Sequence, residues 1–176
     1  QVLVTIPVGF YPYDACYVAP TDRVYVANLS NWTVSVIDAS ADTVMATVPV
    51  GAYPEGIAAD PGLNRIYTAN RDDGTVSVID GTTNTVIATY PVGLSPTHLA
   101  VDPGTHVVYV VNADSRDVSV INPVGPSVAP VPVGLHPRGG ICVHPALGKV
   151  FVTNHQSNDI TVFNAAPPWN TATLRL

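Results

Sequence analysis

The sequence predicts an all-β protein of many short strands. Val, Thr and Ile together supply 56 of the 176 residues, whereas Glu, Lys and Met occur once each. β-branched residues favour strands, and the common helix formers are almost absent. The 17 Pro and 13 Gly residues interrupt the chain too often for a helical bundle or for an α/β sheet with long amphipathic helices. Because 47% of the residues are hydrophobic and 11% are charged, a large core is expected rather than disorder.

A repeat of about 42 residues runs through the whole chain. The tripeptide Pro-Val-Gly begins at positions 7, 49, 91 and 132, and a strand-like segment ends in Asn at positions 28, 70, 112 and 154. An alternating run occupies residues 33–38, 75–80, 117–122 and 159–164. Three patterns with one period identify four copies of a structural unit. We therefore expect a single domain over residues 1–176, with repeats at 9–50, 51–92, 93–133 and 134–176, and an extra segment at 1–8.

Each repeat contains four expected strands, which in the second copy are residues 56–60, 65–70, 75–80 and 85–92. Asp60-Pro61-Gly62 is typical of a type I turn, and Asp72-Asp73-Gly74 is a hairpin signal. Such short connections require antiparallel neighbours, so each repeat is expected to be a four-stranded meander. A lone twisted sheet cannot bury both faces, but sheets packed around an axis can, which predicts a β-propeller. A β-solenoid is the weaker alternative.

Tyr25-Val26-Ala27-Asn28, with its counterparts at 67–70, 109–112 and 151–154, resembles the YVTN β-propeller repeat family. The resemblance implies a bacterial or archaeal protein that is secreted or lies on the cell surface, related to surface-layer-associated and quinoprotein-like propellers. In that family residues 15–19, 56–60, 98–102 and 140–144 would be innermost strands. Residues 43–50, 85–92, 127–133 and 171–176 would be outermost. Residues 2–8 would form a further outer strand, for which four blades have no place.

The loops that follow Pro-Val-Gly are the least repetitive and most polar part of the chain, and they would face the mouth of the central channel. A ligand site there is one hypothesis, and plain solvated loop tips are the other. The candidate ligand-binding residues are Tyr11, Tyr13, Asp14, Tyr53, Glu55, Thr97, His98, His136 and Arg138.

Other candidate sites have simpler explanations. Cys142 and His144 lie two residues apart on one expected strand, but further metal ligands are lacking, so no metal site is predicted. Aligned on the turns, Cys16 and Cys142 are one residue out of register, which argues against a disulfide. Asn28 and Asn31 both begin N-glycosylation patterns, a weak indication of secretion.

The function expected from the sequence is that of a structural or interaction module on the cell surface or outside the cell. A net charge of −6 without a basic run gives no basis for nucleic-acid binding, and no apolar run is long enough for a transmembrane helix. No catalytic motif is present, and no cofactor is expected. The expected partner is a protein or a second copy. Pairing of residues 2–8 with another copy as an added strand would give a dimer of eight blades or a head-to-tail polymer. The alternative is a ligand-binding, cofactor-binding or enzymatic propeller that uses the channel mouth, and a longer chain with about seven repeats is a further possibility.

Overall fold

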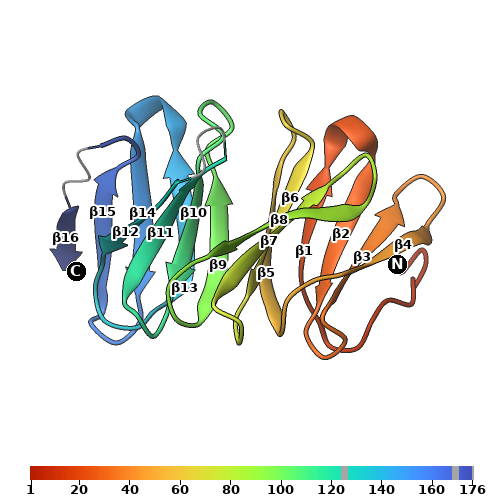
Figure 1. Ribbon diagram of the computed structural model, residues 1–176, viewed down its shortest axis with the longest axis horizontal. Helices are drawn as coiled ribbons and strands as arrows, with labels where there is room; N and C mark the ends of the chain where they lie inside the picture. The colour runs from red at the N-terminus through yellow and green to blue at the C-terminus, as the bar shows by residue number, and fades with distance from the viewer. Residues whose placement is uncertain (124–126, 168–170, 176) are drawn as a thin grey trace.

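The computed structural model describes residues 1–123, 127–167 and 171–175, and it contains four antiparallel four-stranded sheets (Figure 1). We call these sheets blades 1 to 4. Blade 1 holds β1 (Pro12–Val18), β2 (Arg23–Asn28), β3 (Thr33–Asp38) and β4 (Thr43–Pro49). Blade 2 holds β5 (Pro54–Asp60), β6 (Arg65–Asn70), β7 (Thr75–Asp80) and β8 (Thr85–Pro91). Blade 3 holds β9 (Pro96–Val101), β10 (Val108–Asn112), β11 (Asp117–Asn122) and β12 (Ser127–Pro132). Blade 4 holds β13 (Pro137–His144), β14 (Lys149–Asn154), β15 (Asp159–Asn164) and β16 (Thr171–Arg175).

The four blades form an open arc rather than a closed ring. The inner strands β1, β5, β9 and β13 lie next to one another in chain order, and no comparable contact joins β1 to β13 within the described ranges. Blades 1 and 4 accordingly stand at opposite ends of the long axis (Figure 1). The all-β fold with four-stranded propeller blades is confirmed.

The core lies between blades, where the front face of each blade packs on the rear face of the next. We define the front face as the one carrying Tyr25, Tyr67, Tyr109 or Phe151, and the rear face as the one carrying Val24, Ile66, Val108 or Val150. Tyr25, Val34 and Val36 of blade 1 pack with Ile57, Ile66 and Ile79 of blade 2, and the next two junctions repeat this arrangement. Burying apolar side chains between blades contributes on the order of 25 cal/mol per Å² and holds the arc together.

The inner strands begin two or three residues earlier than the repeat predicts. β5 starts at Pro54 rather than Gly56, and its pairing with β6 shifts between those two residues. The shift is a β-bulge, which leaves one extra residue, here Glu55, unpaired in the ladder. The same displacement occurs in the other three blades, so part of the expected mouth loop is strand.

Residues 2–8 belong to none of the four sheets. Gly9 nevertheless approaches Asn28 as Gly51 approaches Asn70, since an added Cβ at either glycine would lie 2.6 Å from the Asn Cγ. The segment before Gly9 is therefore held where the outer strand of a preceding blade would run. The segment is surplus to the four blades, but the prediction of an outer strand over residues 2–8 is wrong, because the segment has no strand partner in the described structure.

The four repeated Asn residues tie neighbouring strands together from within each blade. Asn112 is fully buried, and its Nδ2 donates to the Asp117 carboxylate at 2.6 Å and to the Ser119 hydroxyl at 2.9 Å. Asn28, Asn70 and Asn154 make equivalent pairs of bonds. These bonds go to side chains, so the amide bridges two strands instead of capping backbone groups.

Aspartates at the strand ends organise the turns. Asp60 Oδ1 accepts from the backbone N–H groups of Gly62 and Leu63 at 3.0 and 3.2 Å, and its Oδ2 meets His106 Nδ1 of blade 3 at 2.8 Å. At the exposed turn after β7, backbone N–H groups of Thr83 and Thr82 hold the pKa of Asp80 below its usual value. The aspartates therefore stabilise turns and, at Asp60, the junction between two blades.

Cys16 and Cys142 occupy equivalent positions, contrary to the expectation from the turns. Cys16 stands opposite Tyr25 in the β1–β2 ladder, and Cys142 stands opposite Phe151 in the β13–β14 ladder. The alignment of the two cysteines on the turn prolines was wrong by one residue. The short 3₁₀ helix η1 (Ala19–Thr21) places Pro20 one residue later in its repeat than Pro61 in the second repeat. Both thiols are free, but only Cys16 is covered, by blade 2.

We predict that iodoacetamide alkylates Cys142 much faster than Cys16 in dilute folded protein. Burial, with a smaller contribution from the Asp14 carboxylate, raises the pKa of Cys16 to about 12. At pH 8 its reactive thiolate is then roughly one part in ten thousand, whereas Cys142 is exposed. Peptide mass spectrometry over time would measure both rates, and urea-unfolded protein, in which the two rates should converge, is the control. Equal rates in the folded protein would contradict the burial of Cys16.

Candidate ligand site at the channel mouth

In each blade the residue directly before the inner strand has a left-handed conformation. Tyr11, Tyr53, Ser95 and His136 have φ between 49° and 58°, and each is followed by Pro. A non-Gly residue rarely adopts this conformation, so the surrounding structure must hold it. Here the carbonyl of each accepts a bond from the residue after the repeated Asn, as from Arg71 N to Tyr53 O at 3.0 Å and from His155 N to His136 O at 3.1 Å.

This bond pairs two non-repetitive residues in every blade, and in blades 2 and 4 it brings their side chains together. In blade 2 the Arg71 guanidinium lies 6.0 Å from the centre of the Tyr53 ring, and in blade 4 the His136 and His155 rings lie 6.4 Å apart, edge to face. The blade 3 pair is Ser95 and Ala113. One backbone frame therefore displays different chemistry in each blade.

The bulge at the start of each inner strand adds a second set of side chains. The bulge residue is Glu55 in blade 2 and Thr97 in blade 3, and Arg138 follows Pro137 at the irregular start of β13 in blade 4. Bulges commonly redirect a side chain near a functional site. Thr97 is buried, and its hydroxyl has no hydrogen-bond partner among the described residues.

Glu55 is the electrostatic centre of the mouth. Its side chain is only 3% exposed, and neither carboxylate oxygen accepts a hydrogen bond from the described residues. Arg71 Nε lies 3.5 Å from Oε2, and Arg138 Nη2 of blade 4 lies 3.7 Å from Oε1. A buried carboxylate needs compensating charge. The single Glu of the chain is thus held by two guanidinium groups from different blades.

A pocket of about 320 Å³ opens beside this cluster and is lined by His136, Arg138, Gly139 and His155. Arg71 and Arg138 are partly exposed, with 33% and 44% of their side chains accessible. Two cations, two imidazoles and one carboxylate give the cluster a net charge of +1 with the histidines neutral. No group of three or more His, Cys, Asp or Glu residues able to hold a metal ion occurs in the described part of the chain.

The structure brings together four of the residues predicted from the sequence: Tyr53, Glu55, His136 and Arg138. Tyr11 and Tyr13 are exposed on blade 1. Asp14 instead links blades, because its Oδ2 accepts from the Ile57 backbone N–H at 3.0 Å. His98 is half-buried, and its Nδ1 has no partner among the described residues.

Sequence reasoning missed Arg71 and His155. Both directly follow the repeated Asn, at a position where the other two repeats have Leu29 and Ala113. A change of residue type beside an unchanged Asn was the signal that could have found them.

The glycosylation candidates differ in accessibility. Asn28 is buried, and its amide is engaged by Thr33 and Ser35. Asn31 is exposed, and its Oδ1 accepts from the Phe10 N–H. Asn31 is therefore the position where a glycan could project, and its glycosylation stays a prediction.

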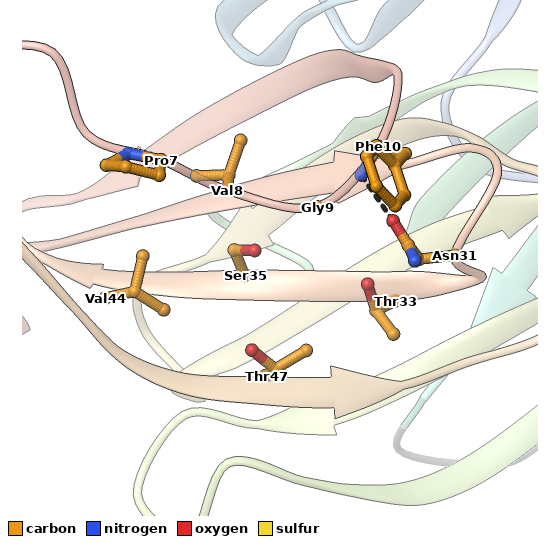
Figure 2. A pocket seen from close by; sticks show the side chains of 9 residues that line it. All are labelled: Pro7, Val8, Gly9, Phe10, Asn31, Thr33, Ser35, Val44 and Thr47. Atoms are coloured by element: carbon orange, nitrogen blue, oxygen red, sulfur yellow. Dashed lines mark hydrogen bonds between the residues drawn. The ribbon is translucent and has the colours of Figure 1, made fainter.

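A second hollow lies on the rear face of blade 1 (Figure 2). Its volume is about 370 Å³, and the N-terminal segment from Pro7 to Phe10 passes over Thr33, Ser35, Val44 and Thr47. On blade 2 the corresponding rear face is covered by blade 1. The hollow is therefore the uncovered half of a blade junction.

Solved structures with the same fold include the hydrazine synthase of Kuenenia stuttgartiensis, at 19% identity and a TM-score of 0.81, over 99% of this chain and 53% of that one. U3-55K matches at 11% identity and a TM-score of 0.82, over 96% of this chain and 53% of its own. Streptogramin B lyase matches at 13% identity and a TM-score of 0.78, over 94% of this chain and 54% of its own.

No family model and no curated protein matches the sequence. In the described residues no helix is long and apolar enough to cross a membrane. The structural matches show that the chain has a β-propeller fold and that it spans about half the length of these relatives.

Proposed function

We propose that this chain is a non-catalytic interaction module of the YVTN repeat type, outside the cell or on its surface, and that it assembles with a second copy through its two open blade faces. The observation that carries the proposal is that, among the described residues, no blade packs on the front face of blade 4 or on the rear face of blade 1. The secreted location rests on the resemblance of the repeats and on the exposed Asn31 pattern.

The two open faces are the halves of a junction that the chain makes three times internally. The rear-face residue Ile66 and the front-face residues Tyr67 and Tyr109 are fully buried at such junctions. Their counterparts Val24 on blade 1 and Phe151 on blade 4 are only partly buried. Since front faces pack on rear faces throughout, blade 4 of one copy has the surface that blade 1 of another requires.

Two copies supply a ring of ordinary size. Eight blades lie at the upper end of the usual range of about four to eight for propellers. The solved relatives are about twice as long as the part that this chain matches. In such a dimer the N-terminal segment would lie over the junction hollow of Figure 2, beside the incoming blade 4.

The test is the mass in solution together with the reactivity of Cys142. Light scattering at about 100 μM should give twice the monomer mass of 18.4 kDa, and alkylation of Cys142 should slow as the protein concentration rises. Val26→Asp on the open rear face and Ile160→Asp on the open front face should each yield monomers. The matched control is Ile87→Asp, at an exposed position on β8, which should leave the dimer intact.

The contribution of the N-terminal segment is tested separately by deleting residues 1–8. The deletion should raise the dimer dissociation constant by at least tenfold, because it removes the contacts that the segment would make with the incoming blade 4. A wild-type protein that stays monomeric, with Cys142 equally reactive at all concentrations, would overturn the proposed assembly.

A further inference from the structure

The channel mouth suggests a second property, which goes beyond the proposed assembly because its residues belong to blades 2 and 4 of one chain. We propose that Arg71 and Arg138 bind the carboxylate of a small monoanionic molecule, which occupies the pocket lined by His136 and His155.

Arg71 and Arg138 carry N–H donors that the described part of the protein does not itself use. Both arginines lie at ion-pair distance from Glu55, but neither side chain makes a hydrogen bond to a described residue within the usual limit. A guanidinium group carries five N–H donors in a planar fork that matches a carboxylate. Since both side chains are partly exposed, these donors are available to a ligand. The ring N–H groups of His136 and His155 supply further donors at the pocket wall.

The net charge of the cluster at the channel mouth favours a monoanion. Glu55 neutralises one of the two cations, so the cluster keeps a net charge of +1, which matches a monoanion. Asp72, Asp73 and Asp114 line the neighbouring pocket with Arg71. Their negative charge repels any anion and repels a dianion about twice as strongly, so phosphate and sulfate are disfavoured relative to a monoanion. A carboxylate therefore suits the mouth better than a doubly charged group.

The pocket also limits the size and the orientation of a bound molecule. A pocket of about 320 Å³ lies at the lower end of the range of about 300–1,000 Å³ for small-molecule sites. The Tyr53 ring beneath Arg71 and the edge-to-face His136–His155 pair limit the position of the charged group. Glu55 acts as a positioning residue, because its buried carboxylate draws Arg71 and Arg138 toward each other from blades two apart.

The proposal is tested by calorimetric titration with D-glucuronate, with D-glucose as the uncharged match and sulfate as the dianion. D-glucuronate should bind at least tenfold more tightly than either comparison compound. Arg138→Gln and Arg71→Gln should each weaken that binding at least tenfold, whereas Lys149→Gln, an equal charge loss at an exposed position, should not. In NMR spectra, the imidazole signals of His136 and His155 should shift during the titration.

The same titration on the Val26→Asp variant separates this proposal from the proposed assembly. Binding by that monomeric variant would support a site contained in one chain. No binding of D-glucuronate by the wild-type protein, equal binding of sulfate, or full binding by Arg138→Gln would each overturn the assignment.

Discussion

Replacing Tyr109 with Ala should destabilise the protein by about 3–5 kcal/mol, the range for removing a large buried aromatic side chain. Tyr109 is fully buried at the junction of blades 3 and 4, and its ring lies 6.0 Å from that of Phe163 in an edge-to-face arrangement. Its hydroxyl donates to the Ala165 carbonyl at 2.6 Å. The substitution therefore opens a cavity and removes a bond between blades. Urea denaturation followed by far-UV circular dichroism would measure the loss.

Two further variants divide this effect into its parts. Tyr109→Phe keeps the ring but leaves the Ala165 carbonyl without its donor, so the expected loss is about 0.5–1.5 kcal/mol. Tyr13→Ala removes an exposed ring and should change stability by less than about 0.5 kcal/mol. If Tyr109→Ala were no worse than Tyr13→Ala, the packing between blades 3 and 4 described above would be wrong.

Replacing Gly56 with Ala should cost about 1–3 kcal/mol or more, because it forces backbone rather than side chain to move. A Cβ at this position would lie 2.2 Å from the Thr97 carbonyl oxygen on the adjacent inner strand. Blades 2 and 3 would have to separate, and the neighbouring Glu55 would shift with β5. The expected result is a lower urea midpoint together with weaker D-glucuronate binding.

Gly104→Ala is the matched control for that substitution. Its added Cβ would meet only the Asp102 Oδ1 at 3.5 Å, an ordinary contact, and its φ is not left-handed. We expect a change between neutral and about 1 kcal/mol of stabilisation, since Ala restricts the unfolded chain. Equal losses for both variants would contradict the close approach of β5 and β9.

The repeat predicted the blades because every bond within a blade is local in sequence. Pro-Val-Gly, the Asn-ended strand and the Asp turns each determine contacts within about 42 residues, so their spacing was enough to place strands and turns. The open arc was not predictable in this way, because the spacing of repeats does not give the rotation from one blade to the next. Two sequence features pointed to missing blades, namely the surplus segment at residues 2–8 and a count of four repeats where the family that the chain resembles has about seven.

The structure brings four of the expected mouth residues together, and ligand binding by them stays a prediction. Glu55 and Arg138 were among those residues because they lie in the variable, polar loops that follow Pro-Val-Gly. Their contact depends on a bulge and on the curvature of the arc, and neither appears in the residue pattern. Arg71 belongs to a hairpin that looked like an ordinary turn, so only the backbone bond to Tyr53 shows that it faces the same opening.

In each blade, the left-handed residue before the inner strand and the hairpin residue bonded to it differ in role from the residues around them. The Asn, Gly and Pro around each pair maintain the backbone, while the pairs Tyr11–Leu29, Tyr53–Arg71, Ser95–Ala113 and His136–His155 share no chemistry. Mutations at the exposed members Tyr11 and His155 can therefore accumulate without disturbing the interior, whereas Leu29 and Ala113 are buried. A lineage of such chains could acquire new recognition properties one blade at a time, while the selection that maintains folding acts on other residues.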